Sequence, residues 1–378
     1  MNILFISHDS SHTGAPLALL SLLKSIKTSV PDMKFSVFCK KNGPLVEDFK
    51  QVCPVILPTG KPWYLKTLFT PTNFRDRLSI RLFLQHIKHQ RFDMIYANSA
   101  SSLSCAVILK THLHIPILLH FHESNINQCY IHTRRNWIRE CDHFIAVSQL
   151  SFNSLVELGG NPSRIHIIYP TSIFIPILLS ERQSLIQFHN QKQKTIIGFV
   201  GPLIDRKGAD LLAIVMKRLS DKYPNCEFEI WSIGNYLDQE RRRVEYDANR
   251  LGVRDKITFI DSLNNPIPTY RETDILLVLS REESFSLVVV EFGLLGKPVI
   301  LFDGSCGVQH FLRNDQNAII VPYLDINGIA EAIYMLSQDR EKCHLLGENL
   351  RNVMRNHYLQ TDTNEEIIKI LSSMDSSD

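Results

Sequence analysis

The sequence lacks the features that would place it at once in several large classes of protein. No Asp-x-Asp triplet occurs, so no close carboxylate pair is evident that could hold a divalent cation on a nucleotide diphosphate. The eight cysteines are scattered and include no Cys-x-x-Cys pair, which argues against a disulfide framework or a zinc site. A formal net charge of +2 gives no bulk reason to expect nucleic acid as a partner.

Long apolar runs are missing as well. No stretch approaches the roughly 18–20 apolar residues that a membrane-spanning helix needs. The opening segment Met1–Ser7 is interpreted as a β-strand and not as a secretory leader, because it lacks the basic start and the longer apolar core of a leader. We therefore expect a cytoplasmic protein with reduced cysteines, no metal and no other cofactor.

Length and patterning predict two α/β domains. A chain of 378 residues is too long for one compact core, and its short apolar runs alternate with helical patterns, as parallel sheets require. The predicted strands of the first half are Ile3–Ile6, Phe35–Phe38, Met94–Ala97, Ile117–Leu119, Phe144–Val147 and Ile165–Ile168. Those of the second half are Thr195–Val200, Glu227–Ser232, Ile257–Ile260, Ile275–Leu279, Val299–Phe302 and Ala318–Val321.

Helical patterns separate these strands. The main predicted helices are Ala15–Ile26, Asp76–His89, Ser102–His112, Asn136–Cys141, Gln149–Leu158, Ile326–Gln338, Arg340–Asn356 and Asn364–Ser372. A composition shift between Ile173 and Lys194 predicts an interdomain linker. The expected domains are residues 1–178 and 195–356, followed by a C-terminal helix and polar tail at 357–378, with the last helix packing back across the junction.

The most informative stretch carries two glutamates eight positions apart, Glu283 and Glu291. The apolar run Ile275–Leu279 predicts a buried strand before them, and Leu287–Leu295 predicts a helix that contains the second glutamate. Glu283 is therefore expected in a strand-to-helix loop. An alternative interpretation is a solvated loop glutamate and an unrelated glutamate on the helix surface.

The start of that helix suits a phosphate group. The backbone N–H groups of Phe285, Ser286 and Leu287 open the helix, and such unpaired donors carry partial positive charge. Two carboxylates that can bind sugar hydroxyls, with an anion site between them, fit a nucleotide-sugar.

The Glu-x7-Glu pattern of Glu283 and Glu291, with Ser-Phe-Ser-Leu between them and Gly-Lys-Pro-Val-Ile behind, resembles the retaining glycosyltransferases of family 4. The resemblance covers nearly the whole chain. It implies the GT-B fold, in which two Rossmann-like domains with parallel sheets face each other across a cleft. It also implies that Glu283 contacts the donor sugar and that Glu291 holds the ribose.

A glycine-bounded basic loop, Gly201–Gly208, follows the first predicted strand of the second domain. Arg206 and Lys207 can place two cations against a diphosphate. The family usually has an arginine where Pro202 stands here, so Arg206 is expected to supply that charge from a neighbouring position. The alternative is a solvated basic loop.

Further positions follow from the resemblance. Gly14 matches the glycine loop that covers the donor phosphate, and His122 matches a histidine that approaches the transferred sugar, whereas His120 is expected to point to the opposite strand face and to be packed. Gly234 and Asn235 match a loop near the nucleotide base. The chain departs from the family pattern at Pro202, Thr171 and His310.

A basic stretch, Phe74–Arg91, lies near the aromatic pair Trp63 and Tyr64. A basic amphipathic helix beside aromatic residues could rest on an anionic bilayer. An ordinary sheet-covering helix with a basic outer face explains the pattern equally well.

The expected activity is transfer of a sugar from a UDP- or GDP-type donor to a hydroxyl of a glycan or lipid-linked acceptor, with retention of configuration and without a metal. The expected setting is cell-surface polysaccharide synthesis at the inner face of the plasma membrane. Two alternatives stay open: a non-catalytic homologue that serves as a binding or scaffolding subunit, and a nucleotide-sugar epimerase of the same fold.

Overall fold

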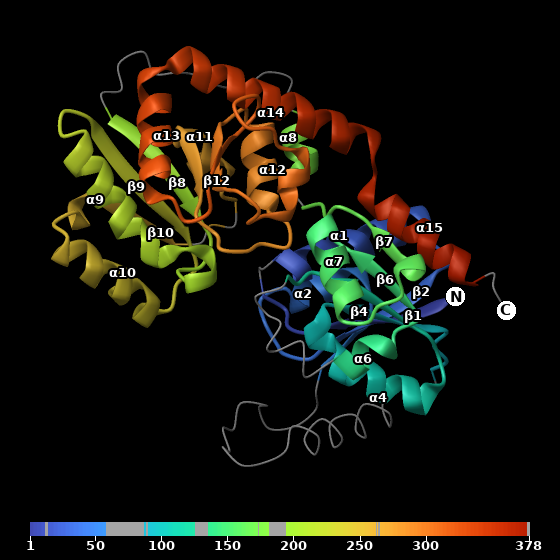
Figure 1. Ribbon diagram of the computed structural model, residues 1–378. Helices are drawn as coiled ribbons and strands as arrows, with labels where there is room; N and C mark the ends of the chain where they lie inside the picture. Colours follow the sequence, from blue (N-terminus) through green and yellow to red (C-terminus); the bar gives the residue numbers. More distant parts are fainter. Residues whose placement is uncertain are drawn as a thin grey trace. The chain divides into compact units, whose positions relative to one another are not determined.

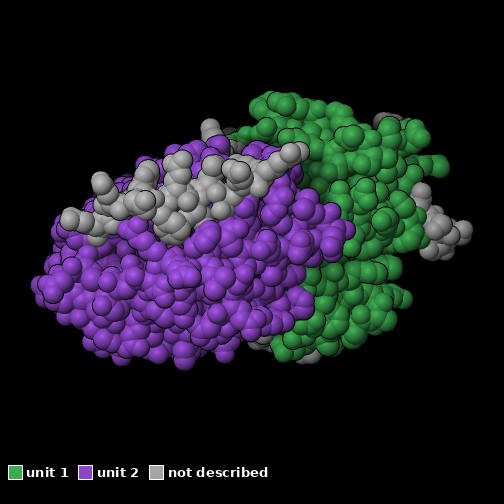
Figure 2. Space-filling view, turned by 90° about the horizontal axis from the view of Figure 1, so that it is seen from above, with its two compact units in different colours: residues 1–173, 362–378 green, residues 174–361 purple. Residues whose placement is uncertain are grey.

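The computed structural model divides into two compact units (Figure 2). Unit 1 comprises Met1–Ile173 and Asp362–Asp378, and unit 2 comprises Phe174–Thr361. The structure describes residues 1–11, 14–57, 87, 90–124, 135–172, 174–180, 194–261, 263 and 265–375.

The described part of unit 1 is built on a seven-stranded parallel sheet. In spatial order its strands are β3 (Val55–Ile56), β2 (Lys34–Cys39), β1 (Asn2–Ser7), β4 (Met94–Asn98), β5 (Ile117–Phe121), β6 (His143–Ala146) and β7 (Ile165–Ile167). Its helices are α1 (Gly14–Ser29), α2 (Val46–Val52), α4 (Leu103–Leu113), α6 (Arg135–Arg139), α7 (Gln149–Glu157) and α15 (Thr363–Asp375) (Figure 1).

The C-terminal helix belongs to the core of unit 1. Helix α1 buries Leu19, Leu23 and Ile26, and α15 packs against α1, with Ile367 and Leu371 in the same apolar cluster. Each such side chain contributes about 1.5–3 kcal/mol when it is fully buried. The last thirteen described residues therefore complete the core of the unit in which the chain begins.

The described part of unit 2 is built on a six-stranded parallel sheet. In spatial order its strands are β10 (Ile257–Asp261), β9 (Glu227–Gly234), β8 (Lys194–Val200), β11 (Ile275–Val278), β12 (Val299–Phe302) and β13 (Ile319–Val321). Its helices are α8 (Ile175–Ser180), α9 (Leu212–Lys222), α10 (Asp238–Arg250), α11 (Ile267–Glu272), α12 (Leu287–Leu294), α13 (Ile326–Gln338) and α14 (Arg340–Gln360).

Helix α12 is buried on nearly all sides. Its residues Val289, Val290 and Phe292 are inaccessible to solvent, and it packs against α8 and α14. A helix that is apolar all round gains its stability from such burial on every face. The position of its first turn, which opens at the carboxyl end of β11, is therefore fixed by the core of unit 2.

The α/β class predicted from the sequence is confirmed, and every predicted strand overlaps an observed one. Two short elements, α2 and β3, were not predicted, because seven and two residues are too few to show a periodic pattern. Within the predicted linker, the apolar run around Ile175 and Leu178 forms α8, which packs on α12 and α14. The predicted helix Asp76–His89 lies almost entirely outside the described residues.

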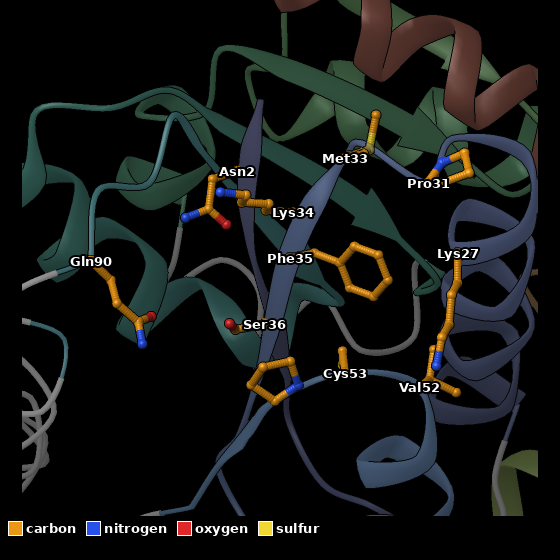
Figure 3. Close-up of a pocket in the computed structure, with 11 residues that line it drawn as sticks. Asn2, Lys27, Pro31, Met33, Lys34, Phe35, Ser36, Val52, Cys53 and Gln90 are labelled. Atoms are coloured by element: carbon orange, nitrogen blue, oxygen red, sulfur yellow. The ribbon is translucent and has the colours of Figure 1, made fainter.

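A surface cavity of about 390 Å³ lies at the amino-terminal end of the unit 1 sheet (Figure 3). It is lined by Asn2 and Lys34, the first residues of β1 and β2, and by Lys27 and Phe35. Ligands of open α/β sheets bind at the opposite, carboxyl ends of the strands. None of the site residues predicted from the sequence lines this cavity.

Candidate functional site

Glu283 lies in the loop between β11 and α12, and neighbouring backbone fixes its position. Its N–H donates to the carbonyl of Ser305 at 2.7 Å, and its carbonyl accepts from the N–H of Gly307 at 2.9 Å. The hydroxyl of Ser280 donates to Glu283 Oε2 at 3.0 Å. The loop after β12 thus holds the backbone of Glu283, and Ser280, two residues past β11, holds its carboxylate at the carboxyl edge of the sheet.

Lys207 forms an ion pair with Glu283. Its Nζ lies 2.6 Å from Oε1 and 2.5 Å from Oε2, and both side chains are only 12% exposed. The pair joins the loop after β8 to the loop after β11. A charge-assisted contact with both carboxylate oxygens at low exposure is among the stronger polar interactions in proteins.

Two glycines allow the loop after β8 to lie close to the ends of the neighbouring strands β11 and β9. Gly208 has a φ of +77°, and a Cβ added there would lie 2.1 Å from the carbonyl oxygen of Leu279. A Cβ added at Gly234, the last residue of β9, would lie 2.6 Å from the carbonyl oxygen of Gly201. Both contacts are closer than any other residue tolerates, so glycine is required at each position.

Arg206 and its neighbours tie the same two loops together. Arg206 Nη1 donates to the carbonyl of Glu282 at 3.0 Å, and the Arg206 carbonyl accepts from the N–H of Arg281 at 2.8 Å. Arg281 also binds both carboxylate oxygens of Asp210 at 2.8 Å, and this hydrogen bonding lowers the pKa of Asp210. Contacts made by Arg206 and Arg281, and not only the charge of Lys207, therefore fix the position of Lys207.

Helix α12 brings its first turn to the same place. Ser286 is the N-cap residue, and its side chain makes no capping hydrogen bond. Ser286 is 4% exposed and Phe285 is 6% exposed. Lys207, Glu283 and Ser286 line one small cavity at the carboxyl ends of β8 and β11. The structure therefore brings together the cation, the carboxylate and the helix start that the sequence predicted at one site, with Leu287 as the first helical residue.

Glu291, the second predicted carboxylate, is the fifth residue of α12 and is 5% exposed. It is not among the residues that line the small cavity. Burial, and then the charge of Glu291, raise the pKa of Tyr270 well above its ordinary value. Gly234 is partly buried at the end of β9, and Asn235 beside it is exposed.

In unit 1, His122 follows β5 directly, and Gly14 is the exposed first residue of α1. The ring of His122 lies 4.0 Å from that of His120, centroid to centroid, with a tilt of 37°. The prediction that His120 points to the opposite face was wrong, because residues two apart in a strand share a face. The prediction that it is packed was correct, since it is 4% exposed and its Nδ1 lies 2.7 Å from the hydroxyl of Tyr96.

Burial, and then the nearby His8, lower the pKa of His122 to about 3. The imidazole of His122 is therefore neutral at physiological pH. In that form it can accept one hydrogen bond and donate another, but it supplies no positive charge.

Sequence reasoning missed the residues that hold the predicted ones in place. Asn98, the last residue of β4, lies 3.3 Å from the ring of His122, and Ser280 donates to Glu283. Both are polar residues at the carboxyl end of a buried strand, which is the signal that could have found them.

Two expectations concern metals and membranes. Across the described residues, no group of three or more His, Cys, Asp or Glu side chains is arranged to hold a metal ion. Each helix within the described ranges falls short of the length or apolar character that a membrane crossing requires. Most of the basic stretch Phe74–Arg91, with Trp63 and Tyr64, lies outside the described residues.

Comparison with known proteins places the chain in a family. Residues 34–171 match the model for glycosyltransferase family 4, and residues 181–353 match the model for glycosyl transferases group 1, so that together the two span most of the chain. An uncharacterized 41.2 kDa protein in the cps region of Klebsiella pneumoniae is 26% identical over 78% of this chain and 86% of its own length. The lipopolysaccharide core biosynthesis glycosyltransferase LpsE of Rhizobium meliloti is 27% identical over 44% of this chain.

In seven other curated relatives, the chain covers about half or less of the relative's own length. The crystal structure of Anabaena HepE with UDP and glucose superposes with a TM-score of 0.79 at 21% identity, covering 99% of this chain and all of that one. Such a likeness establishes the fold. The chain therefore belongs to the family 4 glycosyltransferases and has the GT-B fold.

Proposed function

We propose that the protein transfers a sugar from a nucleotide diphosphate sugar, of UDP or GDP type, to a hydroxyl group with retention of anomeric configuration. Glu283 would bind hydroxyls of the donor sugar, and Glu291 would bind the ribose. Lys207 and Arg206 would face the diphosphate, and His122 would approach the transferred sugar.

The remaining proposed donor contacts are backbone groups and small residues. The N–H groups of Phe285, Ser286 and Leu287 at the start of α12 would bind a phosphate oxygen. Gly14, Gly201, Gly234 and Asn235 would allow the donor to approach the backbone closely.

The ion pair between Lys207 and Glu283 is the observation that carries this proposal. It supports a role in diphosphate binding because the ammonium group is already oriented at the helix start, next to the carboxylate proposed for the sugar. A preorganised cation requires little rearrangement when negative charge develops on the leaving diphosphate. The two cations of this loop, and the absence of an Asp-x-Asp triplet from the sequence, support a reaction without a divalent ion.

The proposed reaction forms one bond and breaks one at the anomeric carbon. The bond from this carbon to the diphosphate oxygen breaks, and the acceptor oxygen bonds to the same carbon on the same face. The proton of the acceptor hydroxyl passes to the departing diphosphate. The protein would contribute positioning and charge stabilisation, with Lys207 closest to the developing charge.

The acceptor is proposed to be a glycan or lipid-linked sugar of a cell-surface polysaccharide, processed in the cytoplasm at the inner membrane face. The names of the Klebsiella and Rhizobium relatives support this setting. The UDP and glucose bound by the Anabaena protein support a nucleotide-sugar donor.

The second candidate is a non-catalytic homologue, favoured by the departures at Pro202, Thr171 and His310. Both candidates predict that a nucleotide diphosphate raises the thermal stability of the protein, because a ligand that binds only the folded state stabilises it. UDP, GDP and ADP would be screened first. The matching nucleotide-sugar would then be incubated with protein, and the anomeric configuration of the released or transferred sugar read by proton NMR.

Cleavage with retention supports the transferase. Stabilisation by a nucleotide without any cleavage or transfer, in the presence of a panel of glycan and lipid-linked acceptors, would favour the non-catalytic homologue. Cleavage with inversion would contradict the proposal outright. Interconversion of the donor sugar while it stays attached to the nucleotide would indicate an epimerase.

A further inference from the structure

The side chain of Asn98 lies between helix α1 and His122. Asn98 is the last residue of β4, pairs with β5 in the sheet, and is inaccessible to solvent. Its Nδ2 donates to the carbonyl oxygen of Ala15 at 2.9 Å. Its Oδ1 lies 3.3 Å from Nε2 of His122.

The carbonyl of Ala15 determines which way the Asn98 amide faces. A backbone carbonyl oxygen only accepts hydrogen bonds, so the NH2 group of Asn98 must be the atom directed toward it. The amide oxygen then occupies the other branch, on the side of His122. Because an amide oxygen cannot donate, the ring nitrogen that meets it must carry the hydrogen.

The His122 ring therefore has a defined tautomer. A neutral imidazole carries hydrogen on one nitrogen, so protonation of Nε2 leaves Nδ1 as the acceptor nitrogen. The pKa of His122, lowered to about 3 by burial and then by His8, is consistent with a ring that stays neutral.

The backbone and ring plane of His122 are held by other groups. Glu123 Oε2 accepts from the N–H of His122 at 3.0 Å, and Oε1 of the same carboxylate accepts from the N–H of Ala100 at 2.9 Å. The ring lies against that of His120, at 4.0 Å between centroids and with a tilt of 37°. These contacts fix where the ring lies, but they do not decide which ring nitrogen carries the hydrogen.

We propose that Asn98 is a positioning residue that holds His122 in the Nε2–H tautomer and connects that choice to the first turn of α1. The expected effect of Asn98 on sugar transfer rests on the proposed function. The tautomer itself does not depend on that function.

The direct test is nitrogen NMR of the full chain labelled with ¹⁵N in the histidine rings, at pH 7.5. Long-range proton–nitrogen spectra would be compared with those of His122→Gln, which identifies the His122 signals. The expected result is a protonated Nε2 and an unprotonated Nδ1 in the wild type. A protonated Nδ1, a doubly protonated ring, or an averaged signal in the wild type would overturn the proposal.

Two variants test the role of Asn98 itself. Asn98→Leu should give averaged nitrogen signals for His122, and Asn98→Asp should shift the pKa of His122 upward, because a carboxylate favours the charged ring. Unchanged signals in both variants would overturn the proposal. The matched control is Asn153→Ala, which replaces an exposed residue of α7 and should leave the His122 signals as in the wild type.

The activity measurement separates this proposal from the proposed function. Asn98→Leu should lower kcat/KM for sugar transfer by about tenfold, the loss of roughly one hydrogen bond, while affinity for the sugar-free nucleotide diphosphate stays unchanged. A fall in nucleotide affinity equal to that in kcat/KM would indicate a general structural role and contradict the proposal. A wild type with the expected tautomer but no transfer would overturn the proposed function alone.

Discussion

Replacing Lys207 by methionine removes the ammonium group and keeps most of the alkyl chain, so it isolates the charge. In the proposed reaction that charge matters more as the diphosphate departs than it does before. Loss of one preorganised charge-stabilising donor typically costs about 2.7–4 kcal/mol of transition-state stabilisation, roughly a 10²–10³-fold fall in kcat. Lys207→Arg should recover little, because a planar guanidinium does not replace a compact ammonium.

The ion pair predicts a second effect, on stability. Lys207→Met leaves the Glu283 carboxylate, 12% exposed, without the cation that contacts both of its oxygens. The expected cost is about 1.5–3 kcal/mol, the range for hydrogen bonds to charged groups. Changing Glu283→Gln in the same chain should restore much of the stability but none of the turnover.

The assay measures kcat and KM from nucleotide diphosphate release and the free energy of unfolding from denaturant titration. The matched control is Lys217→Met, which breaks an exposed pair with Asp221 in the same unit and should cost only about 0.3–0.5 kcal/mol. If Lys207→Met has near-normal turnover while its stability falls as expected, the pair is structural. Near-normal turnover in Arg206→Ala as well would mean that this loop does not touch the phosphates.

Four other predictions follow from the same geometry. Glu291→Gln should weaken nucleotide binding by about 1.5–3 kcal/mol in calorimetry, and unchanged affinity for every nucleotide diphosphate would refute a ribose contact. Treatment with EDTA should leave transfer largely intact, whereas a full loss that Mg²⁺ or Mn²⁺ restores would reveal a metal site. Gly208→Ala should lower both the free energy of unfolding and kcat, because the added Cβ would lie 2.1 Å from the carbonyl oxygen of Leu279. A variant that unfolds and turns over like the wild type would contradict the loop conformation described for Gly208. Because the pKa of His122 is about 3 in the folded protein and about 6.5 in the unfolded chain, His122 contributes stability above pH 6.5 that is lost as the pH falls toward 3. The free energy of unfolding of His122→Gln should therefore depend less on pH in that window than that of the wild type.

The sequence predicted those parts of the fold whose patterns are local. Strands such as Ile275–Leu279 are continuous apolar runs, and the helix that contains Glu291 has an apolar pattern with a clear end. The place of Glu283 in a strand-to-helix loop follows from those two elements alone. Short elements such as β3 have too few residues for a pattern, and their position depends on pairing with β2.

Contacts between distant loops could not be predicted in this way. Lys207 and Glu283 are 76 positions apart, and nothing in either loop specifies that their side chains meet. The amide of Asn98 likewise contacts α1, 83 positions away, and His122. Such contacts result from the order of strands in the sheet, which brings the carboxyl ends of β4 and β5, or of β8 and β11, side by side.

Isothermal titration calorimetry tests most directly whether Lys207 and Glu283 form part of a nucleotide-sugar site. UDP, GDP, ADP and the corresponding nucleotide-sugars would be titrated into the wild type, Lys207→Met, Glu283→Gln and the control Lys217→Met. At least one nucleotide diphosphate should bind the wild type and the control with equal affinity and bind Lys207→Met much more weakly. Glu283→Gln should weaken binding of the nucleotide-sugar more than binding of the nucleotide. Failure of every nucleotide and nucleotide-sugar to bind the folded wild type, or equal binding by all four proteins, would contradict the account.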